Sequence, residues 1–331
     1  MRKRVKLLGL SALPFIVIIG VLIFYKSPLT DFPPGTPGSP VSISISSGES
    51  GSQIAIDLAR KGVILSSQSF FRVATGDQRS RGISPGVHSI DSHITSLEAL
   101  NQLLDTKRNL GVIPVIEGST TSDVLDALKQ GGIKGEIGKV DLPRFVVGTS
   151  LEGALFPASY AFAEGTTRHH AIVEMVKRFD QEVEAVGLKS GFQKYSAYDV
   201  LKIASLIQIE ADPADYAKAA RVIYNRLAIS MPLQLNSTVQ YAIHTRGHIT
   251  LTRKETAIAS AYNTYLHTGL PPTPISNPGR AALLAALHPV AGDWLYFITV
   301  KPHETRFTKS FAQFDSWVTI YNNNVANGLF K

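Results

Sequence analysis

A helix that ends in a carboxylate just before a proline is the feature that most constrains this chain. Three apolar residues share one helix face with Glu210, standing seven, four and three positions before it: Ile203, Leu206 and Ile207. Asp212-Pro213 then breaks the helix, because the residue before a proline is pushed out of the α region. We predict that Asp212 caps a second helix, Pro213 to about Leu227, so that Glu210 lies at an elbow between two helices.

The surroundings of Glu210 favour its protonated form. Apolar neighbours and the carbonyl-rich end of a helix both disfavour a negative charge, which raises the pKa of the carboxyl group. A carboxyl that stays protonated near neutral pH is what general acid catalysis requires. The other interpretation is a solvated glutamate that pairs with Lys202 or Arg221.

Composition excludes several classes of function. The chain has 331 residues, a length typical of two or three domains. Its net charge is +7, but residues 1–26 hold five basic residues and no acid, so only two net charges remain elsewhere. This balance gives no case for nucleic acid as a partner. The absence of cysteine excludes disulfides, thiol catalysis and cysteine-ligated metal.

An apolar run, residues 7–25, follows four basic residues at the N-terminus. At the rise of an α-helix it spans about 28 Å, close to the thickness of a bilayer core. We therefore predict a single-pass anchor over residues 1–26 in the cytoplasmic membrane, with the N-terminus inside and the remainder outside. A cleavable signal peptide is the alternative, although no small-x-small cleavage site follows the run. Residues 27–40 form a Pro/Gly-rich linker.

The rest of the chain alternates helical and strand patterns, which predicts an α+β fold. Strands are expected near 41–46, 86–90 and 110–117, and helices near 52–61, 67–75, 95–105 and 122–130. From about residue 145 the chain is mainly helical. A strand over 294–300, a pairing segment over 306–308 and a helix over 311–324 close it.

No nucleophile elbow, phosphate-binding loop or H-E-x-x-H motif occurs in the sequence. The nine histidines are scattered, and the single pair, His169-His170, is typical of a solvated helix cap. We therefore expect no metal and no cofactor, and carboxylate chemistry is the best remaining option. The candidate carboxylates are Glu117, Glu152, Glu210, Asp212 and Glu255; for Glu117 and Glu152, a turn or a packing role is the simpler interpretation.

Several motifs, in order over nearly the whole chain, resemble those of the endolytic murein transglycosylases, the YceG-like family. They lie at 115–118 (VIEG), 151–160 (LEGALFPASY), 204–210 (ASLIQIE), 222–227 (VIYNRL), 231–241 (MPLQLNSTVQY), 262–265 (YNTY) and 269–279 (GLPPTPISNPG). The resemblance implies a LysM-like α+β module over 41–110 and a mainly helical YceG-like catalytic domain with a short β element over 111–331.

The chain departs from the family pattern at six positions. Gln208 replaces the first glutamate of an E-x-E pair, whereas Glu210 keeps the second, the family's catalytic acid. Asn236-Ser237 replaces Asp-Pro, and Ala158 replaces Asp. Thr305 and Phe314 stand where the family has histidines that flank a phenylalanine, here Phe307.

The resemblance implies cleavage of peptidoglycan glycan strands between N-acetylmuramic acid and N-acetylglucosamine, which leaves 1,6-anhydro ends and limits the length of nascent strands. It implies that Glu210 serves as acid and then base, without a cofactor. Residues expected to bind the substrate are Gln234, Tyr262, Asn263, Gln208 and Glu117. The implied partners are the glycan strands, the cytoplasmic membrane and the peptidoglycan synthases.

Two rival functions remain open from the residues alone. The first is a muramidase that uses the same glutamate together with water. The second is a membrane-anchored peptidoglycan-binding scaffold without catalysis, which the changes at Gln208, Thr305 and Phe314 would favour.

Overall fold

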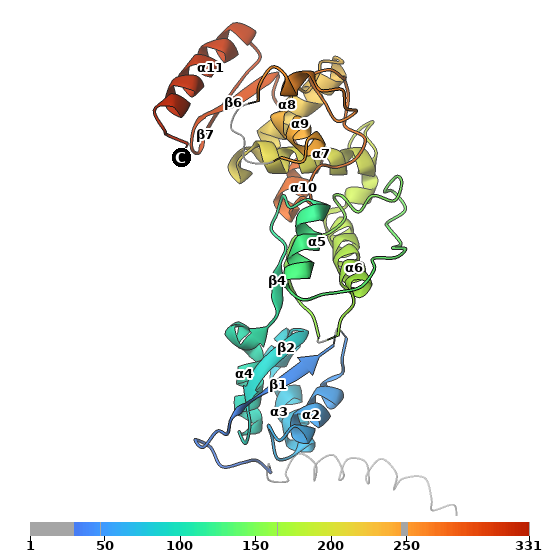
Figure 1. The fold of residues 1–331 in the computed structure, drawn as a ribbon, viewed down its shortest axis with the longest axis vertical. Helices are drawn as coiled ribbons and strands as arrows, with labels where there is room; N and C mark the ends of the chain where they lie inside the picture. The colour runs from blue at the N-terminus through green and yellow to red at the C-terminus, as the bar shows by residue number, and fades with distance from the viewer. Residues whose placement is uncertain (1–29, 47, 164, 246–250, 331) are drawn as a thin grey trace, which may run out of the picture. The chain divides into compact units, whose positions relative to one another are not determined.

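The computed structural model describes residues 30–46, 48–163, 165–245 and 251–330. The predicted membrane segment lies outside these ranges, and none of the helices within them is both long and apolar enough to cross a bilayer. Two compact units are present (Figure 1): the first comprises residues up to 112 together with 161–165, and the second comprises 113–160 together with the remainder from 166.

The first unit is a three-stranded antiparallel sheet with helices. Its strands are β1 (Pro40–Ile45), β2 (Gly86–Asp91) and β3 (Asn109–Leu110), in the order β1-β2-β3. Its helices are α2 (Gly51–Arg60), α3 (Ser67–Gly76) and α4 (Ser96–Leu104), with short 3₁₀ turns η1 (Gln78–Gly82) and η2 (Thr106–Arg108). Helix α4, which the sequence predicts near 95–105, begins with a capping box: the side chain of Thr95 accepts from the N–H of Glu98, and the side chain of Glu98 accepts from the N–H of Thr95. A LysM-like function for this unit stays a prediction.

Two aromatic side chains of the first unit, Phe70 and Phe71, pack in or against its hydrophobic core. Phe70 is fully buried and Phe71 packs against the same cluster, so neither forms an exposed platform for glycan. The predicted strand over 110–117 is wrong as one element. Gly111, with φ of 82°, breaks it, so β3 stays with β2 while β4 (Val112–Pro114) pairs with β5 (Ser159–Ala161).

The second unit is built mainly from helices. These are α5 (Thr121–Gln130), α6 (Arg168–Val186), α7 (Ala197–Glu210), α8 (Tyr216–Ala228), α9 (Asn236–Ala242) and α10 (Arg280–Leu287), with 3₁₀ turns η3 (Leu188–Ser190), η4 (Pro213–Asp215) and η5 (Glu255–Ala257). Helix α7 packs against α8 and α10, and most of its residues are buried. It therefore serves as the central helix of this core.

The elbow after Glu210 is present, but its second helix begins later than predicted. Asp212 makes no side-chain capping bond, and Pro213–Asp215 form the 3₁₀ turn η4, closed by the N–H of Asp215 on the carbonyl of Asp212 at 2.8 Å. Helix α8 proper starts at Tyr216. A tighter turn satisfies the peptide groups that a proline-led start leaves without a side-chain cap.

The chain closes with the predicted hairpin and helix. Strands β6 (Tyr296–Lys301) and β7 (Glu304–Thr308) pair antiparallel, and α11 (Phe311–Ala326) packs alongside β6 (Figure 1). None of the residues of α11 is buried. Helix α11 therefore packs on the hairpin of β6 and β7 without contributing a buried residue.

Candidate active site

Glu210 is the last residue of α7, where the apolar face of the helix reaches the surface. Ile203, Leu206 and Ile207 are fully buried, while Glu210 is half-buried. Its Oε1 accepts a hydrogen bond of 3.0 Å from the peptide N–H of Ser237, in the first turn of α9. Leu235, the N-cap residue of α9, has no polar side chain that could cap the helix. The carboxyl group of Glu210 therefore accepts from a peptide N–H of the first turn that has no partner within the helix.

The protein environment raises the pKa of Glu210 above its ordinary value. Burial among apolar groups is the main cause, and the nearby hydroxyl and peptide N–H of Ser237 lower the pKa in part. The two predicted ionic partners lie elsewhere: Lys202 stands 3.9 Å from Asp199, and Arg221 donates to backbone carbonyls of the loop after α10. Glu210 thus has the properties of a general acid.

Glu210 lines a cleft of about 700 Å³, here named the Glu210 cleft. Gln234, Asn236 and Tyr265 lie on its wall near the acid, and the Tyr265 hydroxyl donates to Asn236 Oδ1 at 2.6 Å. Glu210 is the only carboxylate among the described residues that line this cleft. The site therefore offers one carboxyl group rather than a catalytic pair.

Aromatic side chains from the C-terminal hairpin and helix also line the Glu210 cleft. The rings of Tyr296 and Phe314 stack at 5.2 Å, and Phe311 lies 5.7 Å from Tyr296 while 62% of its surface stays exposed. We call these three residues the aromatic wall. The sequence alone did not assign Tyr296 or Phe311 to the site, because neither the strand pattern that begins at Tyr296 nor the helix pattern that begins at Phe311 distinguishes a residue that lines a cleft from one on a solvated face.

Of the five residues expected to bind the substrate, only Gln234 lines the Glu210 cleft. Gln234 is exposed there, on a left-handed backbone (φ 51°) that its peptide N–H fixes by a 3.0 Å bond to the carbonyl of Thr264. Tyr262 instead shares a hydrogen bond of 2.8 Å with Thr273. Asn263 is fully buried and does not line the cleft either.

The side-chain amide of Asn263 forms hydrogen bonds with backbone groups of the surrounding loop. Its Nδ2 donates to the carbonyls of Thr256 and Ile258, and its Oδ1 accepts from the N–H of Tyr265. Asn263 therefore fixes the loop that presents Tyr265 to the cleft, which is a supporting role rather than a contact with substrate. The described residues also contain no group of three or more His, Asp or Glu side chains that could hold a metal ion.

Comparisons with known proteins agree with this geometry. The model of the YceG-like family matches residues 43–319. The chain belongs to the YceG-like family. A relative from Bacillus subtilis named endolytic murein transglycosylase is 32% identical over 324 residues, which cover 90% of this chain and 89% of the relative. A relative of the same name from Streptococcus pneumoniae is 36% identical over 45% of this chain and 28% of its own length.

A solved YceG-like structure supports the fold. The crystal structure of a YceG-like protein from Listeria monocytogenes superposes with a TM-score of 0.54 at 26% identity, over 84% of this chain and 98% of the other. The mixed α+β architecture described above is therefore the YceG-like fold.

Two predicted substrate residues of the YceG-like pattern form a separate cluster. The amide of Gln208 donates to the Tyr216 hydroxyl at 2.8 Å and accepts from the N–H of Gly279 at 2.9 Å. The carboxyl group of Glu117 lies over Gly279, where a Cβ would stand only 1.9 Å from Oε1. Neither residue lines the Glu210 cleft. This cluster joins α7, α8 and the start of α10, so its evident role is to position α7.

Thr305 and Phe314, the two positions at which the family pattern predicts histidines, differ in their relation to the Glu210 cleft. Phe314 lines the Glu210 cleft as part of the aromatic wall. Thr305 stands behind it and shares a 3.0 Å hydrogen bond with Thr299, which lines the cleft. Only Phe314 thus changes the surface of the cleft, which is aromatic at this position.

The remaining candidate carboxylates have structural partners. Glu152 is buried and accepts from the N–H of Thr121 at 3.0 Å and from the Tyr241 hydroxyl at 3.1 Å. Asp212 lies 3.1 Å from His303, and Glu255 caps its own turn through Thr252. The packing role expected for Glu152 is thus observed, and Glu210 is left as the candidate acid.

Proposed function

We propose that this protein is a peptidoglycan lytic transglycosylase that cleaves glycan strands internally, between N-acetylmuramic acid and N-acetylglucosamine. The observation that carries the proposal is the single carboxylate of the Glu210 cleft. Ordinary glycosidases flank the bond with two carboxyl groups, one of which activates water or attacks the sugar. A transglycosylase needs only one, because the nucleophile is a hydroxyl of the substrate. The names of the relatives support the same activity.

The reaction balances with Glu210 alone. The protonated carboxyl donates its proton to the glycosidic oxygen as the bond from C1 of the muramyl ring to that oxygen breaks, which releases the N-acetylglucosamine side with a free hydroxyl. The 6-hydroxyl of the same muramyl ring then bonds to C1, and its proton passes to the Glu210 carboxylate. The acid is regenerated and no water is consumed.

The cleft favours the intramolecular hydroxyl over solvent. A nucleophile held on the same ring reacts at a high effective molarity when its geometry is fixed. The aromatic wall of Tyr296, Phe311 and Phe314 provides apolar surface in the same cleft as Gln234 and Asn236, so a bound strand displaces water from the acid. Aromatic faces also suit the C–H faces of sugar rings.

Mass spectrometry of purified glycan strands incubated with the full-length protein tests this function. We expect 1,6-anhydro ends, and Glu210→Gln should abolish them, whereas Glu184→Gln, an exposed site on α6, should not. Reducing ends would identify a muramidase instead. Binding of strands without any cleavage would identify a scaffold.

We also propose that the chain is a single-pass protein of the cytoplasmic membrane whose catalytic domain lies outside, where it limits the length of strands made by peptidoglycan synthases. The basic flank and apolar run at residues 2–25 support this topology. A reporter that works only in the exported compartment should be active when fused after Lys331. Activity of a cytoplasmic reporter, or loss of residues 1–26 from the mature protein, would contradict the topology.

A further inference from the structure

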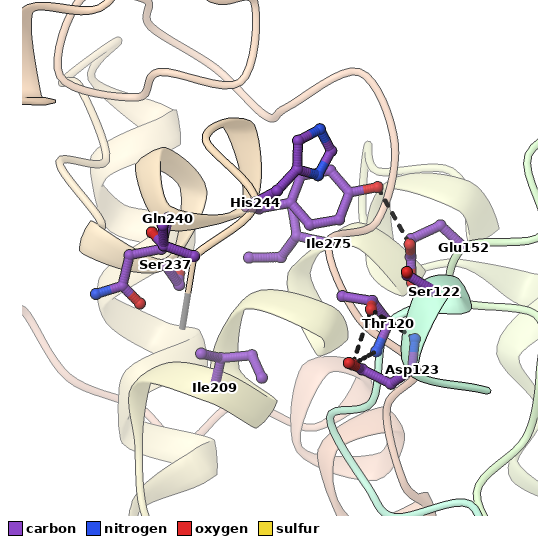
Figure 2. Close-up of a pocket in the computed structure, with 11 residues that line it drawn as sticks. Thr120, Ser122, Asp123, Glu152, Ile209, Ser237, Gln240, His244 and Ile275 are labelled. Carbon is purple, nitrogen blue, oxygen red and sulfur yellow. Dashed lines mark hydrogen bonds between the residues drawn. The ribbon is translucent and has the colours of Figure 1, made fainter. Parts of the chain in front are cut away.

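A second, smaller cavity adjoins Glu210 and is not used by the mechanism above. It has a volume of about 240 Å³ and we call it the Ser237 pocket. Figure 2 shows Ser237 and Gln240 of α9, and His244 just after this helix, on one side of the pocket, with Asp123 and Glu152 facing them and Ile209 below. Ile209 directly precedes Glu210, and the N–H of Ser237 bonds to Glu210. Residues that adjoin Glu210 in sequence and by hydrogen bond therefore line the pocket, whereas Glu210 itself lines the larger cleft.

Two hydroxyl groups in this pocket are buried without a hydrogen-bond partner. Ser237 is only 6% exposed, and its Oγ makes no hydrogen bond of acceptable geometry, even to the nearby Glu210. The Oγ1 of Thr245, which also lines the pocket, is likewise buried without a hydrogen-bond partner. Leaving a buried hydroxyl unpaired costs free energy, so two of them in one cavity indicate a ligand that supplies the missing partners.

The lining of the pocket excludes an anionic ligand. Two carboxylates face it, Asp123 and Glu152, and each accepts bonds from nearby peptide N–H groups, Asp123 from Thr120 and Glu152 from Thr121. No Lys or Arg occurs among the described residues that line the pocket. A carboxylate-bearing peptide stem would therefore be repelled, whereas a neutral ligand rich in hydroxyl and amide groups would be accepted.

The volume and the apolar surface of the Ser237 pocket further restrict the kind of ligand that it can bind. A volume of 240 Å³ lies below the roughly 300–1,000 Å³ of sites for drug-sized ligands, so it suits one sugar ring. Ile209, which is 42% exposed, and the side chains of Tyr241 and Ile275 offer the apolar surface on which a pyranose ring rests. The two orphan hydroxyls lie in the same small cavity.

We infer that the Ser237 pocket binds the N-acetylglucosamine ring on the leaving side of the cleaved bond. This inference rests on the proposed function and deepens it, because it orients the strand. The muramyl ring, which carries a lactyl group and a peptide, then occupies the larger Glu210 cleft of about 700 Å³. The neutral ring beside it occupies the smaller, acid-lined pocket.

Binding of a neutral probe tests the pocket apart from catalysis. Chitotetraose, a chain of N-acetylglucosamine without lactyl or peptide groups, is titrated by calorimetry into full-length protein that carries Glu210→Gln. Ser237→Ala keeps the N–H that contacts residue 210 and removes only the hydroxyl, and Thr245→Val removes the other hydroxyl. Each should weaken binding about 2- to 10-fold, the effect of one lost hydrogen bond.

Matched controls and a blocking variant complete the experiment. Ser316→Ala and Thr319→Val remove hydroxyls from exposed positions on α11 and should leave the affinity unchanged. Ser122→Trp places a large side chain at the mouth of the pocket from an exposed position on α5 and should abolish binding without loss of fold.

The outcomes separate this inference from the proposed function. Unchanged affinity in Ser237→Ala, Thr245→Val and Ser122→Trp, with each variant folded by circular dichroism, overturns the pocket assignment. Stronger binding of a free stem peptide than of chitotetraose, lost on Ser122→Trp, also overturns it. If the pocket variants behave as expected but the active enzyme yields reducing ends, the pocket stands and the transglycosylase proposal fails.

Discussion

Helices α7 and α11 both contribute to the Glu210 cleft, yet they are held in opposite ways. Nine of the fourteen residues of α7 are buried, whereas none of the sixteen residues of α11 is. Helix α7 runs through the core and carries a single acid at its last residue, whereas α11 carries aromatic rings on a helix that packs mainly on β6. We infer that the helix carrying the acid is held more firmly than the helix carrying Phe311 and Phe314, because packing in a core restricts motion more than packing at the surface.

Glu210→Gln gives the largest expected effect and tests the role of α7. The amide keeps the size of the side chain but has no proton to transfer, and one residue serves as both acid and base. We expect anhydro-muropeptide release to fall by at least about 10²–10⁴-fold. Near-normal release from folded protein would contradict the assignment, with circular dichroism as the control for folding.

A pair of truncations tests the difference in packing directly. Leu206→Ala on α7 empties a fully buried site and should cost about 2–5 kcal/mol of stability. Ile320→Ala on α11, which is 38% exposed, should cost less than about 1 kcal/mol. Both tryptophans, Trp294 and Trp317, lie in the second unit, so their fluorescence during urea unfolding reports on it. Equal losses would refute the contrast between the two helices.

Phe311→Ala tests the aromatic wall. The ring is exposed in the cleft, so its removal should leave stability almost unchanged and weaken glycan binding about 2- to 10-fold, the typical contribution of an aromatic contact. We expect this effect in KM rather than in kcat. An unchanged KM would show that α11 does not contact the strand.

The pH dependence of stability tests the environment of Glu210 at the end of α7. Because the folded protein raises the pKa of Glu210 above 4.5, the folded state holds this proton more tightly than the unfolded state. The associated stability is present below pH 4.5 and is lost as pH rises through the raised pKa. Glu210→Gln should therefore match the wild type in acid and become relatively more stable at neutral pH; a constant difference would contradict this.

Gln208→Glu should have the smallest effect. The Nε2 of Gln208 donates to the Tyr216 hydroxyl, and its Oε1 accepts from the N–H of Gly279. A carboxylate at position 208 can accept from both of these groups. Because the residue does not line the cleft, we expect release of anhydro products to stay within about threefold of the wild type. A large gain would instead show that the side chain at position 208 orients Glu210, which its present contacts do not indicate.

The local sequence pattern was sufficient to predict the helix that carries Glu210 and the residue at which it ends. The apolar spacing before Glu210 and the proline after Asp212 fixed the end of α7, because helix periodicity and the restriction before proline act within a few residues. The same holds for the helix that begins after Thr95, where a capping box is formed. The raised pKa of Glu210 also followed in direction from its apolar neighbours.

Tertiary structure alone decided what surrounds that acid. Ser237, 27 residues away in sequence, donates its N–H to Glu210, and Phe311 and Phe314 reach the same cleft from the last helix. Asn263, a plausible sugar ligand by its motif, is buried with its amide bonded to backbone. Sequence patterns report the face of a helix that is apolar, but only long-range packing determines which polar groups remain unpaired and face the substrate.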